Sequence, residues 1–326
     1  MQSDHVRVLV AGAGALGSVL GGLLAAAGQD VTLLGRAPHL TVVARTGLAI
    51  DGLWGARHIE NLAVAFAATE LRGPFDAILL TVKSYDTAPM VAAVRDVLAP
   101  RGCLISMQNG LGNLEQVEAS VGAERALGAR EIFGAEIPCP GAVRVTVSAD
   151  PVAVGAVVPG TALAEEGAAA WAERLDAAGV AARYTPDLEA ELWTKVFYNA
   201  ALNPLGALFG LPYGALAADD DARAIMDAVI DEAYAVAAAR GVKPTAASAD
   251  SYRTVFYERL VPATAHHRSS MLQDLERQRP TEIEAMNGCV WRYGRAAGVP
   301  TPVNATLTRL IRWRERLGRG HGTRAC

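Results

Sequence analysis

The chain has 326 residues, of which 51% are hydrophobic and 20% are charged, and its formal net charge is −4 at pH 7. One hydrophobic core rarely grows beyond about 250–300 residues, so we expect two domains. The weakly negative charge and the lack of a long basic run argue against a surface that binds nucleic acid. The four cysteines lie far apart without the spacing of metal ligands, which favours reduced thiols in a cytoplasmic protein and no metal site.

Three glycines near the N-terminus follow a predicted strand. Residues 6–11 are apolar enough for a buried strand, a helix follows the glycines, and a second strand is expected over 31–34. This strand–turn–helix–strand order is the setting in which G-x-G-x-x-G binds a dinucleotide, with the positive end of the helix facing the phosphates. Gly12 permits the tight turn, Gly14 lets backbone N–H groups approach a pyrophosphate, and Gly17 lets the helix pack close to the strand. The cofactor-binding residues predicted in this turn are Gly12, Gly14, Ala15, Leu16 and Gly17.

The same region could be mistaken for a membrane span. The stretch from Val8 to Gln29 contains no charged residue and is long enough to cross a bilayer. It lacks the flanking charged region and cleavage site of a signal peptide. Its glycines stand where the strand–turn–helix unit needs them, so we expect no membrane insertion.

The end of the second strand predicts which dinucleotide is bound. An NAD site usually places Asp or Glu there to hold the ribose 2′-hydroxyl. Here the strand ends in Leu34-Gly35-Arg36, while Asp30 lies at its other end. A guanidinium suits a 2′-phosphate, so Arg36 predicts NADP(H). The alternative is an exposed surface arginine.

Two further strands are expected over 75–82 and 103–107, and polar residues follow both. Ligands of doubly wound sheets bind at the carboxyl ends of the strands, so Lys83 and Asn109 are expected to meet the cofactor or the substrate. Lys83 could equally be a solvated loop lysine, and Asn109-Gly110 alone would be a turn.

The later part of the chain divides the fold in two. Strand-like runs over 142–147 and 152–155, with a helix over 162–178, complete the expected sheet and its covering layer. Beyond Pro186 the apolar periodicity is helical, as in 219–241 with its aspartate N-cap and glycine C-cap. The sequence predicts an α/β Rossmann-type doubly wound parallel sheet in residues 1–186, which binds NADP, and an all-α substrate and catalytic domain in residues 187–326.

Two features of the second domain suggest helix starts. Ser269-Ser270 predicts a helix N-terminus with a serine cap, an end that also attracts a carboxylate. Thr281 and Glu284 fit a capping box in which Glu284 reaches back to the chain before it. That leaves Glu282 for another role, although it could simply be a first-turn acid favoured by the helix dipole.

One predicted helix carries polar residues among apolar neighbours. Lys195, Asn199 and Asn203 follow one another at four-residue steps, which keeps their side chains on one helix face. Burying amides and an ammonium beside Trp193 and Phe197 is costly unless they have partners, and a polar ligand would supply them. The alternative for Lys195 is an exposed i,i+4 ion pair with Glu191, which would leave the two asparagines unexplained.

These residues suit the reduction of a ketone. Hydride delivery to carbon develops negative charge on oxygen, and that oxygen needs a nearby acid. Lys195 can donate the proton, and a carboxylate such as Glu282 would hold the ammonium charged and aimed. Asn199 and Asn203 can hydrogen-bond a polar substrate without adding charge, and Ser270 could bind a substrate carboxylate.

The chain resembles the ketopantoate reductase (2-dehydropantoate 2-reductase) family over essentially its full length. The glycine block alone is not specific to that family. The blocks that carry the resemblance are residues 12–17, 81–84, 108–112, 192–204, 269–274 and 281–288. The resemblance implies NADPH-dependent reduction of 2-dehydropantoate to (R)-pantoate in pantothenate biosynthesis, by a Rossmann domain and a helical domain with the active site in the cleft between them.

The family roles transfer to matching residues of this sequence. Lys195 would be the general acid, and Glu282 would support it and the bound substrate. Arg36 would meet the 2′-phosphate, while Lys83 and Asn109 would lie at the nicotinamide side. The substrate-binding residues implied are Asn199, Asn203 and Ser270. The partner would be a small-molecule 2-oxo acid, with a homodimer as a candidate assembly.

One departure keeps other functions open. Some family members carry a further substrate-binding asparagine after the position of Pro204, and here Tyr213 stands near the expected place. The substrate could therefore be another 2-oxo acid. An NADP-dependent 3-hydroxy acid or opine-type dehydrogenase shares the two-domain plan. A third alternative is a dinucleotide-sensing regulator without catalysis.

Overall fold

The computed structural model describes residues 5–320, and it divides into two compact units. Unit 1 contains the described residues up to Gln108 together with Asn113–Leu188. Unit 2 contains the short loop Asn109–Gly112 together with the described residues from Glu189 onward. The loop thus leaves the sheet-containing unit and belongs, by its contacts, to the second unit.

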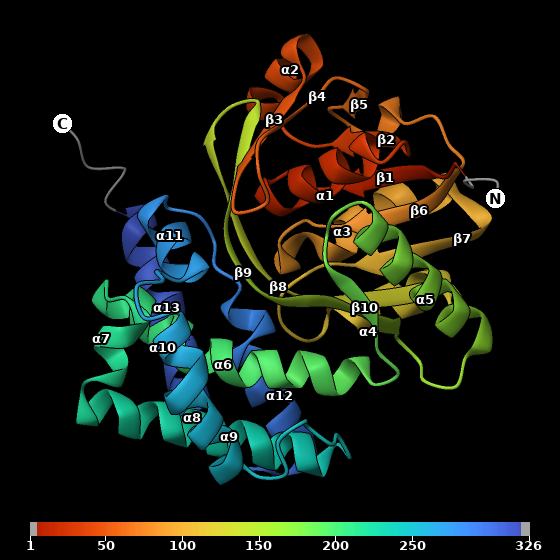
Figure 1. Cartoon of the computed structure of the whole chain (residues 1–326). Coiled ribbons are helices and arrows are strands. Elements are labelled where there is room, and N and C mark those ends of the chain that lie inside the picture. The colour runs from red at the N-terminus through yellow and green to blue at the C-terminus, as the bar shows by residue number, and fades with distance from the viewer. Residues whose placement is uncertain (1–4, 321–326) are drawn as a thin grey trace. The chain divides into compact units, whose positions relative to one another are not determined.

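Unit 1 is built on one sheet of ten strands (Figure 1). The order along the sheet is β4-β3-β9-β8-β7-β6-β1-β2-β5, with β10 beside β9. All neighbouring pairs are parallel except β3–β4 and β8–β9. In chain order the strands are β1 (Arg7–Ala11), β2 (Asp30–Leu34), β3 (Leu48–Gly52), β4 (Arg57–Ile59), β5 (Leu62–Ala65), β6 (Phe75–Leu80), β7 (Leu98–Ser106), β8 (Ala126–Cys139), β9 (Ala142–Ala156) and β10 (Ala182–Tyr184).

Helices cover both faces of this sheet. The main ones are α1 (Ala15–Ala26), α2 (Ala37–Thr46), α3 (Thr87–Val94), α4 (Asn113–Val121) and α5 (Ala162–Ala177), with 3-10 turns η1 (Ala68–Glu70), η2 (Ser84–Asp86) and η3 (Arg95–Val97). Val8 and Val10 of β1 pack into one core cluster, whereas Leu9 and Ala11 pack into another. Successive strand side chains point to opposite faces, so a strand covered on both faces is continuously apolar. The predicted doubly wound sheet is therefore confirmed.

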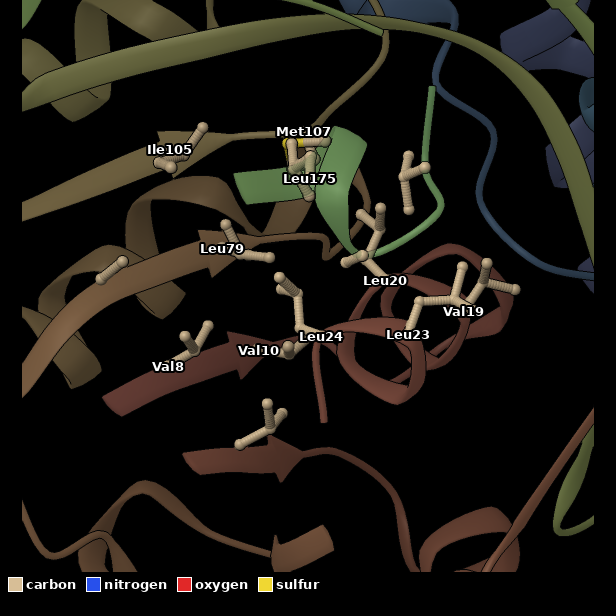
Figure 2. Close-up of a cluster of buried hydrophobic side chains, with 14 of the residues drawn as sticks. Val8, Val10, Val19, Leu20, Leu23, Leu24, Leu79, Ile105, Met107 and Leu175 are labelled. Carbon is tan, nitrogen blue, oxygen red and sulfur yellow. The ribbon is translucent and has the colours of Figure 1, made fainter. Parts of the chain in front are cut away.

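The larger core cluster lies where α1 and α5 meet the sheet. Figure 2 shows Val8, Val10, Leu79 and Ile105 of three strands facing the leucines of α1. The other labelled side chains of this cluster are Val19, Leu20, Leu23, Leu24, Met107 and Leu175. Their burial holds the start of α1, and with it the glycine turn, against the carboxyl end of β1.

The hairpin of β8 and β9 was not anticipated. The runs 142–147 and 152–155 were predicted as separate short strands, yet both belong to β9, which pairs antiparallel with β8 through several register shifts. Ser148–Pro151 interrupts the apolar alternation and resembles a turn in sequence. In the structure Asp150 pairs with Ile132, and its carboxylate accepts a bond from Arg130 at 2.7 Å. Bulges absorb the mismatch, and sequence periodicity does not report them.

Unit 2 is helical, as predicted. Its elements are α6 (Leu188–Phe209), α7 (Tyr213–Ala217), α8 (Asp220–Ala239), α9 (Ala249–Val255), the π-helical turn η4 (Phe256–Leu260), α10 (Val261–Ala263), α11 (Ser270–Glu276), the 3-10 turn η5 (Ile283–Ala285), α12 (Asn287–Ala297) and α13 (Pro302–Gly320). Asp219 caps α8 by accepting the N–H of Ala222, and Gly241 follows the helix with a positive φ of 78°. Both ends of α8 are thus the ordinary caps that the sequence predicts.

The apolar stretch from Val8 to Gln29 lies within unit 1. Its residues divide among β1, the glycine turn and α1. Within residues 5–320, no helix combines the length and the apolarity that crossing a membrane requires.

His39 ties three segments of unit 1 together. Its ring Nδ1 accepts the N–H of Gly141 at 3.1 Å, between β8 and β9, so the proton of the neutral ring sits on Nε2. Nε2 lies 3.0 Å from the hydroxyl of Ser18 in α1 and can donate to it. Burial lowers the pKa of His39, because the charged ring loses its hydration there. A second ring proton would also face the N–H of Gly141 and lose that bond.

The lowered pKa of His39 predicts a pH-dependent stability. The unfolded ring titrates near pH 6.5, so His39 contributes its full stabilisation above that pH and loses it as the pH falls toward the lower folded pKa. The free energy of unfolding of the wild type, relative to His39→Gln, should decrease between about pH 6.5 and pH 5.5 by at most about 1.4 kcal/mol per pH unit. Urea unfolding of both proteins across this range measures the difference. A difference that stays constant with pH would contradict the neutral-ring assignment.

Candidate active site

The glycine turn of unit 1 shows which glycines the fold itself requires. Gly12 has a φ of +120°, and a Cβ there would lie 2.5 Å from the backbone nitrogen of Val82. A Cβ on Gly17 would lie 2.4 Å from the carbonyl oxygen of Gly12. Both positions are therefore closed to larger residues by close packing of strand, turn and helix.

Gly14 differs from these two glycines. Its φ of −84° is open to any residue, and a Cβ there would meet nothing closer than the Gly12 oxygen at 3.9 Å. No side chain of the described residues caps α1 at this position, and the N–H of Gly14 donates to the Gly12 oxygen at 2.6 Å. The N–H groups of the first helical residues have no partner within the helix. The protein does not need glycine here, whereas a phosphate lying against the backbone would. This arrangement fits a dinucleotide whose pyrophosphate rests on Gly14, Ala15 and Leu16.

The remaining predicted cofactor residues of unit 1 lie at strand ends. Arg36 follows β2, is exposed, and is the N-cap residue of α2. Lys83 follows β6, is partly buried, and is the N-cap residue of η2. Thr81 joins the second strand end to the glycine turn, since its hydroxyl donates to the Gly12 oxygen at 2.8 Å. β1 lies between β2 and β6, so these positions flank the glycine turn.

In unit 2, the loop that contains Asn109 is held beside η5. The N–H of Leu111 donates to the oxygen of Ala285 at 2.7 Å. Gly110 has a φ of +85° and passes so close that a Cβ would lie 2.3 Å from the same oxygen. Glu282 is the N-cap residue of η5 and is only 4% exposed. The structure thus brings Asn109 and Glu282, far apart in sequence, onto neighbouring segments.

Helix α6 carries the lysine and the two asparagines. Trp193 and Phe197 are fully buried, and Phe197 stacks on Tyr234 with ring centroids 4.1 Å apart. Lys195, which lies between them in the sequence, is partly buried, whereas Asn199 and Asn203 are buried. Aromatic packing on the other side of the helix fixes its rotation about its axis and therefore the direction of the polar face.

The amide of Asn203 has protein partners on both of its polar atoms. Tyr213, at the start of α7, donates its hydroxyl to Asn203 Oδ1 at 2.6 Å. The Asn203 Nδ2 lies 3.5 Å from the sulfur of Met286, a weak acceptor that follows η5. Burial raises the pKa of Tyr213 well above its ordinary value, so the phenol stays protonated and remains a donor. One lone pair of Asn203 Oδ1 is therefore occupied by Tyr213, and one N–H of Nδ2 faces Met286, which leaves one acceptor site and one donor of this amide for a ligand.

The two serines of the predicted helix start occupy different places. Ser269 is the buried N-cap of α11, and its hydroxyl accepts the N–H of Leu272 at 3.1 Å. The same hydroxyl lies 3.4 Å from the backbone oxygen of Asn203, to which it can donate. Ser270 is the first residue of α11 and is exposed. Ser269 is thus the serine that contacts α6, and only its cap role was expected.

The capping box expected at Thr281 is absent. The Thr281 N–H and hydroxyl both donate to Glu315 of α13 at 2.7 Å. Glu284 instead pairs with Arg312 and Arg292, and these guanidinium groups hold the pKa of Glu284 below its usual value. Thr281 and Glu284 thus bond to residues of distant segments and not to each other, because charge-assisted bonds outweigh a local cap.

Comparison with known proteins assigns the family. The sequence model described as Ketopantoate reductase PanE/ApbA matches residues 8–158, and its counterpart for the C-terminal part, Ketopantoate reductase PanE/ApbA C terminal, matches residues 187–315. The chain belongs to the ketopantoate reductase family. It is 36% identical to a 2-dehydropantoate 2-reductase of Aquifex aeolicus, over 95% of this chain and 97% of that protein.

Solved structures agree with this assignment. A PanE/ApbA family ketopantoate reductase from Ralstonia eutropha JMP134 is 30% identical, with a TM-score of 0.85, over 96% of this chain and 99% of that one. D-Mandelate dehydrogenase, solved with NADH and anilino(oxo)acetate, has a TM-score of 0.87 at 23% identity over 96% and 99% of the two chains, and this likeness shows a shared fold. As a member of the ketopantoate reductase family, the chain is an oxidoreductase that uses a nicotinamide dinucleotide.

Proposed function

We propose that this ketopantoate reductase family member reduces 2-dehydropantoate to (R)-pantoate with NADPH, as a cytoplasmic step of pantothenate biosynthesis. The observation that carries the proposal is α6, which holds one lysine and two asparagines on one face while aromatic rings fix its other side. The 2-dehydropantoate 2-reductase of Aquifex aeolicus, which is similar over nearly the whole chain, supports the choice of substrate.

The proposed chemistry uses few groups. When bound, the cofactor supplies the hydride that reduces the 2-oxo carbon. Lys195 donates a proton to the oxygen of that carbon as negative charge develops on it. Glu282 is buried, and a buried carboxylate is stabilised by a cation, so we assign it to holding the Lys195 ammonium in place. The residues proposed to hold the substrate are Asn199, Asn203 and Ser270.

The proposed cofactor-binding residues are those of the glycine turn together with Arg36, Lys83 and Asn109. Backbone N–H groups of the glycine turn would hold the pyrophosphate, and Arg36 the 2′-phosphate. Lys83 and Asn109 would lie at the nicotinamide side. The exposed guanidinium of Arg36 at the N-terminus of α2 supports NADPH over NADH, because both the charge and the helix end favour an added phosphate.

The contact of Tyr213 with Asn203 indicates a second candidate class of substrate. The Tyr213 hydroxyl occupies one of the two lone pairs of Asn203 Oδ1. A substrate hydroxyl that donates to Asn203 must then share this oxygen with Tyr213. Another branched 2-oxo acid without that hydroxyl is therefore the alternative.

A substrate panel separates these candidates. We expect NADPH oxidation with 2-dehydropantoate to exceed that with 3,3-dimethyl-2-oxobutanoate, which lacks the hydroxyl, by at least about tenfold in kcat/KM. Absorbance of NADPH measures both reactions on the same purified protein. Rapid turnover of the second acid with little of the first would reject 2-dehydropantoate as the substrate.

Lys195→Ala tests the general acid. We expect kcat to fall by about 10²–10⁴-fold, because the proton must then come from water. NADPH binding, followed by fluorescence, should persist. Lys243→Ala is the matched control, since Lys243 is an exposed lysine of the same unit. An unchanged kcat for Lys195→Ala would remove this residue from the mechanism, whereas a wild-type protein that binds NADPH but reduces no 2-oxo acid would favour a regulator that only binds the dinucleotide.

Arg36→Ala tests the choice of cofactor. A charge-assisted bond to the 2′-phosphate is worth about 1.5–3 kcal/mol, so the Kd for NADPH should rise roughly 10- to 100-fold, with little change for NADH. Arg45→Ala serves as control, because Arg45 is exposed on the last turn of the same helix. An equal loss of affinity for both cofactors would refute contact with the 2′-phosphate.

A further inference from the structure

Helix α6 contains a proline between its polar residues and its end. Pro204 lies inside the helix, where it has no N–H to donate to the carbonyl oxygen of Ala200, four residues earlier. A proline ring inside a helix also crowds the carbonyl four residues earlier, which weakens the helix at that point. Ala200 directly follows Asn199 and precedes Asn203 by one turn, so the defect lies between the two asparagines.

Asn287 supplies the missing donor. This residue is the first of α12 and is fully buried, and its Nδ2 donates to the Ala200 oxygen at 3.0 Å. A buried carbonyl without a donor is costly, so the amide of Asn287 stands in for the backbone N–H that Pro204 lacks.

The orientation of this amide is fixed by its surroundings. The second N–H of Asn287 donates to Asn304 Oδ1 at 3.0 Å. Asn304 is itself held by Glu232 of α8, whose carboxylate accepts its Nδ2 at 2.8 Å. Asn287 Oδ1 is buried and has no hydrogen-bond partner within the described part of the chain. Turning the amide over would point this oxygen at two acceptor oxygens, so the donors must face Ala200 and Asn304.

We propose that Asn287 is a positioning residue, which replaces the N–H that Pro204 lacks and thereby fixes the backbone of α6 between Asn199 and Asn203. The functional part of this inference rests on the proposed role of α6 in substrate binding. The first half of α6 is held by the aromatic packing of Phe197, whereas the second half combines buried apolar side chains with bonds from Asn287 and Ser269 to its backbone. Loss of Asn287 should therefore shift Asn203 relative to Asn199 and raise the KM for substrate more than it lowers kcat.

A double-mutant cycle tests whether the amide of Asn287 replaces the backbone N–H that Pro204 lacks. In the wild-type background, Asn287→Ala should lower the equilibrium constant for folding by about ten- to a hundredfold, because a buried carbonyl loses its donor. In the Pro204→Ala background, the backbone N–H returns and the same change should cost clearly less. The bond to Asn304 is lost in both backgrounds, so it cancels from the coupling. Equal losses in the two backgrounds would overturn the proposal.

Kinetics on the same variants test positioning. We expect Asn287→Ala to raise the KM for the 2-oxo acid roughly 10- to 100-fold with NADPH affinity unchanged, and Pro204→Ala to restore part of that loss. Thr308→Val is the control, because it removes a buried bond of 2.7 Å to the Asn304 backbone oxygen without touching α6. A KM for Asn287→Ala no higher than that of Thr308→Val would overturn the positioning role.

The outcomes separate this inference from the proposed function. If the Asn287→Ala protein folds only when Pro204→Ala is also present, the coupling is present in its extreme form and the inference is supported. If it folds in neither background, Asn287→Ser enters the same cycle, with equal losses again overturning the inference. A wild-type protein that reduces no 2-oxo acid would reject the proposed function, and the stability cycle would then decide alone whether Asn287 replaces the missing donor.

Discussion

The rotation of helix α6 about its own axis is the constraint on which the substrate half of the site depends. One side of the helix is buried through Trp193 and Phe197, and the ring of Phe197 contacts both Tyr234 and Tyr252. A helix places residues four apart on one face, so this packing also decides where the polar face points. Rotating the helix would expose an aromatic side and bury an ammonium, and both changes are unfavourable.

Features set by local periodicity could be predicted from the sequence, because strand and helix repeats are written in consecutive residues. The glycine turn and the polar face of α6 are of this kind. The β8–β9 hairpin is not, because Ser148–Pro151 breaks the apolar alternation and only pairing with β8 carries the strand across it. The capping box at Thr281 is local in pattern, yet Glu315 from α13 competes for it. Partners more than thirty residues away cannot be seen in a local motif.

The candidate site also has features that the sequence predicts and features that only tertiary contacts determine. The sequence identifies the residue types that suit ketone reduction and their spacing, but it does not show which of their atoms are already engaged. Asn203 was predicted as a substrate ligand, and the structure adds that its oxygen already accepts one hydrogen bond, from Tyr213. The loop of Asn109 was predicted at a strand end, and the structure adds that backbone contact with Ala285 holds it beside η5. Both additions come from tertiary contacts, which limit the hydrogen bonds that a ligand can form.

A proline in α6 is costly, and it interrupts the hydrogen-bond ladder between the two asparagines. In a straight helix, side chains four residues apart have Cβ atoms about 5–6 Å apart and nearly parallel directions. Where the ladder is interrupted, that arrangement depends on tertiary contacts in place of the missing backbone bond. Because the Ala200 carbonyl is tied to α12 and α13 by buried amides, the relative placement of Asn199 and Asn203 is set by packed helices, which hold side chains more rigidly than loops do.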